Sequence, residues 1–257
     1  MLTEVKYEAT KNAVSREPVI LIRGLKKAFG DNKVLNDFCF QLNKGENVVV
    51  LGKSGSGKSV LIKCIIGLLE QDEGEIEVLG ENVRMLNAEE LDRLRVKIGF
   101  LFQSNALYDS MTVRQNLEFP LRRHWLTVSQ ADVDAMVMEA LDNVGLGYTV
   151  DMMPVELSGG MRKRIALART LILKPEIILY DEPTTGLDPI TGREIGELMI
   201  AIQKKYKTSS LIISHDMKCI KLTADRIVVL MDGRCYAEGT YAELQQAKDK
   251  NVNQFFE

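Results

Sequence analysis

The chain has 257 residues and a mass of 28.9 kDa, which fits one large α/β domain or two small ones. Its 33 Lys and Arg against 36 Asp and Glu leave a net charge of −3, and 46% of the residues are hydrophobic. This composition excludes a disordered chain and a strongly basic nucleic-acid binder. The longest stretch without a charged residue is the eleven residues 98–108, whereas a membrane helix needs about 20 apolar residues, so we expect no membrane span.

The N-terminal segment carries little structural signal. Residues 1–17 are mostly polar and lack a clear period, so we interpret them as a lead-in to a fold that begins at Pro18. Met1–Lys6 contain no apolar run before a small-residue cleavage site, which predicts a protein that stays in the cytosol. The four cysteines show no Cys-x-x-Cys spacing, and we assign them no chemistry.

The next segments predict an antiparallel β patch followed by a buried strand. Val19–Ile22 is a compact β-prone run, and Lys33–Phe40 partly alternates before a turn at Asn43–Gly45. Asn47–Leu51 is a continuous apolar run, as expected for a strand covered on both faces. It leads into a glycine-rich loop and a helical stretch that we expect to end at Leu69.

That loop matches the G-x-x-x-x-G-K-[ST] pattern of a phosphate-binding loop. Its residues are Gly52, Lys53, Ser54, Gly55, Ser56, Gly57, Lys58 and Ser59. Glycines let backbone N–H groups surround a β-phosphate, and the positive end of the following helix adds to the attraction. We expect Lys58 to act at the β- and γ-phosphate oxygens and the Ser59 hydroxyl to bind Mg²⁺. A plain glycine-rich turn with a solvated lysine does not explain why a strand, the loop and a helix come in this order.

Residues 104 to 155 are predicted to form a helical insert. Apolar residues recur at three- and four-residue spacings at Val133, Val137, Ala140, Leu141 and Val144. Glycines at positions 145 and 147 interrupt the pattern.

Strands return after the insert. They are predicted at Ile177–Tyr180, Leu211–Ile213 and Ile227–Met231, and Asp232–Gly233 is a hairpin signal before a last edge strand. Strands that alternate with helices predict an α/β fold with a parallel, doubly wound core.

Two carboxylates follow the first of these strands. In parallel sheets, ligands collect outside the carboxyl ends of the strands, so Asp181 is a candidate second Mg²⁺ anchor. Glu182 is placed to polarise an attacking water as a general base. Two acids in this position are by themselves often solvated turn residues, but together with the phosphate-binding loop they favour catalysis.

Leu157–Met161, followed by a basic and apolar helix pattern, closely resembles the signature motif of ABC-type ATPases. Ser158 would cap a helix that runs to Leu173, and its free N–H groups would form an anion site. The resemblance implies that Ser158, Gly159, Gly160 and Met161 serve the γ-phosphate of an ATP held by the other subunit of a head-to-tail homodimer. It spans about residues 18–240 and implies a RecA-like parallel sheet core, an antiparallel β subdomain and the helical insert, with residues 241–257 as a C-terminal tail.

Other family elements stand in order around the signature. Phe29 resembles the aromatic that stacks on adenine, although a single Phe is more often a core residue. Gln103 resembles the glutamine that touches Mg²⁺ and senses the permease, and Asp188 lies in a segment that resembles the loop crossing between subunits. His215 resembles the catalytic switch histidine at the γ-phosphate, whereas His124 stays unassigned.

A narrower resemblance lies between these motifs. Phe102–Val113, Asn116–Arg122, Met153–Pro154 and Asp188–Ile190 are similar to Mla-type ATPases, and Met161 agrees with that subgroup. The resemblance implies lipid transport at the cytoplasmic face of the inner membrane, with a separate integral permease, an MCE-domain protein and room for a small accessory subunit. Transport of another substrate remains an alternative. A soluble ABC-type ATPase acting on nucleic acid or ribosomes fits poorly, because nucleic-acid binders tend to be basic, and we expect no nucleic-acid partner.

Two further surfaces carry expectations. The segment from Gln103 to Arg123 is expected to dock the permease through apolar and basic side chains, namely Leu107, Tyr108, Met111, Arg122 and Arg123. The alternative is that the apolar members only pack the insert. In the tail, Phe255 and Phe256 have large apolar areas to bury, and either their own subunit or the opposite one would receive them.

Overall fold

The computed structural model describes residues 17–123 and 129–256, and the statements below refer to that part of the chain. His124 and nearly all of the lead-in segment lie outside the described residues. In this part of the chain, no helix combines the length and apolar character that a membrane crossing requires.

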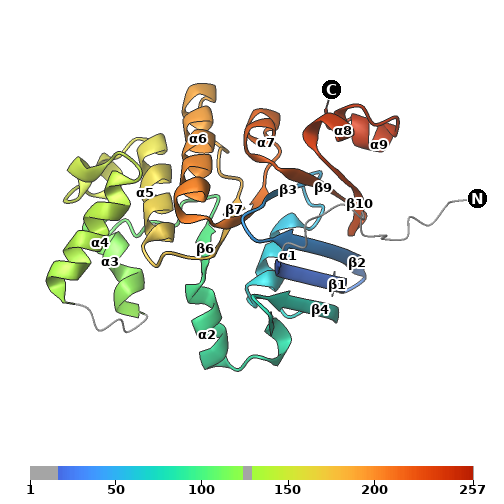
Figure 1. Cartoon of the computed structure of the whole chain (residues 1–257), viewed down its shortest axis with the longest axis horizontal. Helices are drawn as coiled ribbons and strands as arrows, with labels where there is room; N and C mark the ends of the chain where they lie inside the picture. Colours follow the sequence, from blue (N-terminus) through green and yellow to red (C-terminus); the bar gives the residue numbers. More distant parts are fainter. Residues whose placement is uncertain (1–16, 124–128, 257) are drawn as a thin grey trace, which may run out of the picture.

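An antiparallel sheet forms one side of the molecule (Figure 1). Its strand order is β2-β1-β4-β5, with β1 at Pro18–Phe29, β2 at Asn32–Asn43, β4 at Glu73–Val78 and β5 at Glu81–Asn82. The predicted β patch is thereby confirmed, since β1 and β2 pair antiparallel along almost their whole length.

A six-stranded sheet forms the centre, in the order β10-β9-β3-β8-β7-β6. Its members are β3 (Asn47–Leu51), β6 (Ile98–Leu101), β7 (Ile177–Asp181), β8 (Ser209–Ile213), β9 (Arg226–Met231) and β10 (Arg234–Gly239). The pairs among β3, β6, β7, β8 and β9 are parallel, and β10 is an antiparallel edge strand. Asp232 and Gly233 both have positive φ, 51° and 72°, as a type I′ hairpin requires, so the hairpin prediction is confirmed.

Both faces of the central sheet are covered. Alternate residues of β3 point to opposite sides: Val48 and Val50 join a core with α1 (Lys58–Ile65) and the antiparallel sheet. Val49 and Leu51 join a second core. The helices that contribute to this second core include α5 (Gly159–Leu171), α6 (Pro189–Tyr206) and α7 (Met217–Thr223). The sheet is therefore buried between two apolar layers, which explains its continuous apolar strands.

The helical insert packs around a third core at the left of Figure 1. It contains α3 (Val113–Arg123), α4 (Gln130–Asp142) and short 3₁₀ turns at Gly147–Thr149 and Pro154–Glu156. The remaining helices are a 3₁₀ turn at Val83–Met85, α2 (Ala88–Val96), α8 (Tyr241–Gln245) and α9 (Lys250–Asn253).

Some predicted ends were wrong. The helix after the phosphate-binding loop ends at Ile65 rather than Leu69, because Gly67 adopts φ +65°, a left-handed conformation that stops a helix. The signature helix ends at Leu171 rather than Leu173.

The tail lies against its own chain in this structure. Phe255 and Phe256 pack on the second core, and the Phe256 ring meets Tyr241 edge-on at 5.4 Å between centroids. Within the single chain, both side chains are partly buried against their own subunit.

Candidate functional site

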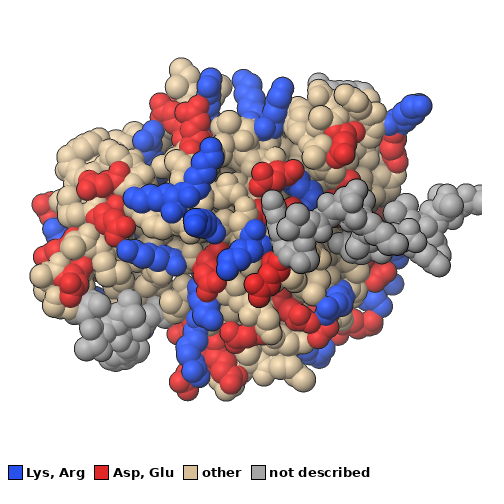
Figure 2. Space-filling model, in the orientation of Figure 1, with Lys and Arg blue, Asp and Glu red and all other residues tan. Residues whose placement is uncertain are grey.

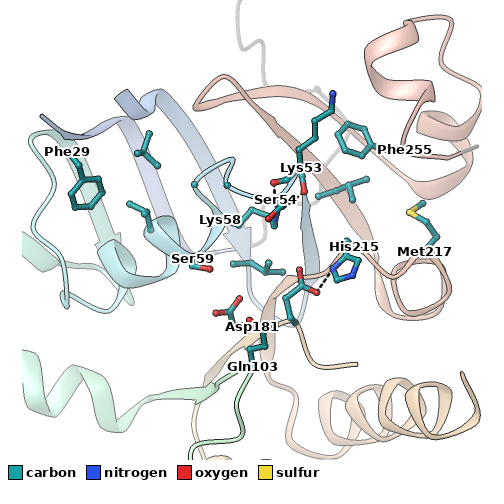
Figure 3. A pocket seen from close by; sticks show the side chains of 18 residues that line it. Phe29, Lys53, Ser54, Lys58, Ser59, Gln103, Asp181, His215, Met217 and Phe255 are labelled. Carbon is teal, nitrogen blue, oxygen red and sulfur yellow. Dashed lines mark hydrogen bonds and ion pairs between the residues drawn. The ribbon is translucent and has the colours of Figure 1, made fainter. Parts of the chain in front are cut away.

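A cleft of about 780 Å³ opens at the carboxyl ends of the central strands (Figure 3). Predicted residues from five separate segments line it: Phe29, Gly52–Gly55, Gly57–Ser59, Gln103, Asp181, Glu182 and His215. Ser56 instead lines an adjoining hollow, and its hydroxyl is buried without a partner. The fold thus gathers in one place residues that are up to 186 positions apart between Phe29 and His215.

The phosphate-binding loop is shaped by β3 and α1. Gly57 has φ +102°, and a Cβ there would lie 2.8 Å from Cγ1 of Val34, so no larger residue fits. Lys58 is 8% exposed, and its ammonium donates to the carbonyls of Gly52 at 2.8 Å and Lys53 at 2.9 Å. The first N–H groups of α1 point outward from the same loop, which makes its start an anion site.

The charges of the cleft are perturbed by burial and by one another. Burial lowers the pKa of Lys58, against the opposing effect of Glu182 and Asp181. Burial and the neighbouring Glu182 raise the pKa of Asp181, although nearby lysines oppose this. Two adjacent partly buried carboxylates therefore need positive charge, and the lysine and a divalent cation would both supply it.

Glu182 is held by specific contacts. Its carboxylate lies 2.8 Å from Nδ1 of His215 and accepts a hydrogen bond of 3.2 Å from the Thr185 hydroxyl. Its backbone has φ +52°, and its N–H donates to the Ile213 carbonyl at 2.9 Å. In Figure 3, the dashed line at the ring of His215 marks this contact. A carboxylate fixed beside an exposed imidazole can orient and deprotonate a water molecule.

The donors for Mg²⁺ fit that ion. Ser59, Gln103 and Asp181 offer a hydroxyl, an amide and a carboxylate in one cleft, and Mg²⁺ prefers such oxygen ligands. In Figure 3, Gln103 and Asp181 lie on the same side of the cleft. Few protein carboxylates are needed, since Mg²⁺ at phosphate sites keeps waters and phosphate oxygens as ligands.

Phe29 lines the cleft and is 50% exposed, so it is not a core residue. The Lys27 ammonium lies 5.6 Å from the ring centroid and 2.7 Å from the Asp72 carboxylate. Asp72 also accepts from the Ala28 N–H at 2.7 Å. These contacts fix the strand end that carries the ring.

The signature residues lie elsewhere. Among the described residues, those lining the cleft include neither Ser158–Met161 nor Asp188. Ser158 caps α5 by accepting from the Met161 N–H at 3.2 Å, as predicted. Asp188 caps α6 and accepts from the N–H groups of Ile190 and Thr191.

The sequence motifs did not predict three residues that contribute to the site. Phe255 of the tail lines the cleft, and Thr185 holds Glu182. Lys163 is buried on α5, which lowers its pKa to about 8, and its ammonium donates to the carbonyls of Phe102 and Gln103. The sequence did hold a signal for Lys163, since it lies on the apolar face of its helix, three residues before the buried Ala166.

The fold and the cleft together define a class: a phosphate-loop ATPase whose sheet carries an antiparallel subdomain and a helical insert. The comparisons agree. Residues 35–185 match the family model described as ABC transporter. The chain belongs to the ABC transporter family and is the ATP-binding, ATP-hydrolysing subunit of such a transporter.

Curated relatives cover nearly the whole chain. The "probable ribonucleotide transport ATP-binding protein mkl" of Mycobacterium leprae is 38% identical over 92% of this chain and 68% of mkl. The "intermembrane phospholipid transport system ATP-binding protein MlaF" of Haemophilus influenzae is 36% identical over 92% of this chain and 89% of MlaF. The "methionine import ATP-binding protein MetN" of Rhizobium johnstonii is 36% identical over 93% of this chain and 66% of MetN.

A solved structure is also similar. The dimeric, post-hydrolysis state of the ATP-binding cassette MJ0796, bound to ADP and Pi, matches with a TM-score of 0.77 and 31% identity. The match covers 86% of this chain and 98% of that one. Similar cassettes thus form dimers and carry hydrolysis products.

Proposed function

We propose that this chain powers a phospholipid transporter, as one half of a head-to-tail homodimer beneath a separate integral permease. The observation that carries the proposal is the similarity to MlaF over nearly the full length of both chains. The resemblance of the segments around Gln103 and the signature to Mla-type ATPases supports it, and adds an MCE-domain protein and a small accessory subunit as partners. The place of action would be the cytoplasmic face of the inner membrane.

The cleft supplies the chemistry of hydrolysis. The loop N–H groups and Lys58 bind the β- and γ-phosphates, and Phe29 stacks on the adenine. Glu182 takes a proton from the attacking water while His215 holds the carboxylate in place. Mg²⁺, bound by Ser59, Gln103 and Asp181 together with the nucleotide, would neutralise phosphate charge.

The partner subunit completes each site. The start of α5 offers free N–H groups and the positive end of the helix dipole, which suit a γ-phosphate. Because Ser158–Met161 are absent from their own cleft among the described residues, we assign them to the nucleotide of the opposite subunit. Asp188 would lie in the loop that crosses between the subunits.

A groove of about 310 Å³ on the insert is the proposed permease dock, lined by Ser110, Met111, Gln115, Phe119 and Arg122. Of the predicted docking residues, Leu107 instead packs against two cores, and the Tyr108 ring contacts Phe119 at a tilt, with 4.9 Å between the ring centroids. Arg122 pairs with the buried Glu118, and Arg123 is 62% exposed at the rim. Met111 is therefore the apolar side chain to test.

Met111→Glu would place a charge in the groove and is expected to abolish co-purification with the permease, while leaving ATP turnover of the isolated chain intact. The matched control is Met85→Glu, a methionine of the 3₁₀ turn Val83–Met85 that is 81% exposed. Retention of the permease by the Met111 variant would place the dock elsewhere.

The cargo is tested by purifying the tagged chain from membranes with its partners and identifying the proteins and bound lipids by mass spectrometry. The proposal expects a permease, an MCE-domain protein and phospholipid. The similarity to MetN favours amino-acid import as the second candidate, which would instead bring down a permease without lipid or MCE protein.

A further inference from the structure

Lys163 is one of the most deeply buried charged side chains described, with 1% of its surface exposed. It lies on α5 facing the end of β6, and its ammonium donates to the Gln103 carbonyl at 3.1 Å and more weakly to Phe102 at 3.4 Å. Burying an ammonium costs free energy unless its N–H donors are satisfied. The hydrogen bonds to the loop carbonyls therefore stabilise the buried lysine as well as the loop.

The loop that Lys163 contacts contains two strained backbone positions. Asn105 and Ala106 follow Gln103 with φ of +64° and +51°, a left-handed conformation that costs a non-glycine residue about 1 kcal/mol or more. Arg169, further along α5, donates to the carbonyls of these two residues at 3.1 and 2.7 Å. Two cations of one helix thus fix four carbonyls in the segment 102–106.

The same face of α5 grips the strand before the loop. Thr170 comes seven residues after Lys163 and is therefore on the same side of the helix. Its hydroxyl lies 2.9 Å from the Ala166 carbonyl of α5 and 3.3 Å from the Phe100 carbonyl of β6. Side chains of α5 consequently contact the backbone at several points from Phe100 of β6 to Ala106. Lys163 itself is not among the residues that line the cleft.

We propose that Lys163 is a positioning residue for Gln103: by holding the Gln103 carbonyl, it sets the backbone from which the amide side chain reaches Mg²⁺ beside Asp181. The inference rests on the proposed role of Gln103 as a metal ligand. It predicts that Lys163 affects the part of ATP affinity that depends on Mg²⁺ and leaves metal-free binding alone.

The test compares the dissociation constant for ATP with Mg²⁺ and with EDTA, in full-length chains that carry Glu182→Gln to stop turnover. Lys163→Met removes the donors and keeps the length of the side chain. It is expected to reduce the Mg²⁺-dependent gain in ATP affinity about tenfold, inside the usual range of coupling between two ligands, with the EDTA value unchanged. Arg164→Met is the matched control, because Arg164 contacts Val144 and Glu194 instead of the loop.

A double-mutant cycle separates positioning from general damage. If Lys163 acts through Gln103, Gln103→Ala alone loses the same gain, and Lys163→Met adds nothing in that background. Additive losses, an equal loss with and without Mg²⁺, or a full gain in Lys163→Met would each overturn the positioning role.

The cycle also tests separately whether Gln103 is a metal ligand, which is the proposed role on which this inference rests. If Gln103→Ala keeps the full Mg²⁺-dependent gain, Gln103 is not a metal ligand, and both assignments are wrong. If Lys163→Met does not fold, Lys163→Gln retains an N–H donor on a shorter side chain and is expected to lose part of the gain; an undiminished gain in that variant counts against the proposal.

Discussion

Glu182 owes its place to two segments. At the end of β8, Ile213 accepts its backbone N–H and His215 contacts its carboxylate, and in the turn after β7 the Thr185 hydroxyl donates to the same carboxylate. A carboxylate restrained in this way keeps one orientation toward the phosphate side of the cleft. This preorganisation is what a general base needs, because it removes the need to search for the water during the reaction.

The first prediction concerns that carboxylate. Glu182→Gln keeps the shape and one acceptor oxygen but cannot take a proton, so ATP turnover should fall at least about a hundredfold while ATP binding persists. Turnover by phosphate release and binding by equilibrium dialysis check both parts. Glu176→Gln, an exposed glutamate just before β7, is the control and should keep wild-type turnover. Near-normal turnover in Glu182→Gln would move the base elsewhere.

At the scale of elements, a partly buried ion-pair network joins the two sheets. Arg226 at the start of β9 binds both carboxylate oxygens of Glu46 at 2.7 and 3.0 Å, Glu238 of β10 at 2.7 Å and the Gln41 carbonyl of β2 at 2.6 Å. Burial alone would raise the pKa of Glu46, but hydrogen bonds from Arg226 and Asn43 outweigh it, so the pKa lies below its ordinary value.

That shift predicts a pH dependence of stability. A carboxyl group whose pKa is lowered by folding stabilises the fold above its unfolded pKa of about 4.3, and the contribution disappears as the pH falls through the lower folded value. Glu46→Gln should therefore be less stable than wild type near neutral pH, with the difference shrinking below about pH 4. Urea unfolding across this range measures it, with the exposed Glu89→Gln as control. A difference that does not change with pH would contradict the prediction.

Sequence patterns predicted the strands whose own composition indicates burial and missed a strand that depends on charged partners. The Val- and Ile-rich strands β3, β7, β8 and β9 were predicted, because continuous apolar runs indicate burial on both faces. β4 was not, since half of its residues are glutamates, which are poor strand formers. In the fold, those glutamates pair across the strands, Glu75 with Arg23 and Glu73 with Lys26.

The same contrast holds within the site. Residues in compact motifs, such as the phosphate-binding loop and the Asp181 and Glu182 pair, were predicted and line one cleft. Lys163 and Thr185 act through contacts with loops or side chains that no spacing rule connects to them. Phe255 reaches the cleft only because the tail folds back over the second core.

At the scale of the whole molecule, the proposed head-to-tail dimer depends on two features that lie apart on one chain. Figure 2 shows acidic and basic residues interspersed over one face. Meanwhile the cleft and the start of α5 are separate features of one chain. A head-to-tail pair would bring each cleft against the other chain's α5.

This arrangement predicts complementation between two inactive variants. Lys58→Ala disables the cleft, and Gly159→Asp puts a negative charge at the start of α5, where a Cβ has room because its nearest neighbour, Cδ2 of Leu187, is 4.0 Å away. Mixed in equal amounts, the two should recover about a quarter of wild-type turnover, because half of the dimers are mixed and each of those has one intact site of two.

The control mixes Lys58→Ala with a chain carrying both changes, a pair that cannot form an intact site and should stay inactive. If the first mixture also stays inactive while dimers form, each chain builds its site alone, and the proposed pairing of cleft and signature is wrong.

The left-handed backbone at Glu182 has a consequence for engineering and for natural drift. At φ +52° a glycine is unstrained, whereas a glutamate pays about 1 kcal/mol, so the residue best for the backbone differs from the residue best for the reaction. Glu182→Gly should consequently be inactive yet lose little thermal stability, because relief of the backbone strain offsets part of the lost contacts with His215 and Thr185. A library screen for heat tolerance alone would therefore not remove inactive variants at this position. Such screens on this protein require ATP turnover as a second criterion.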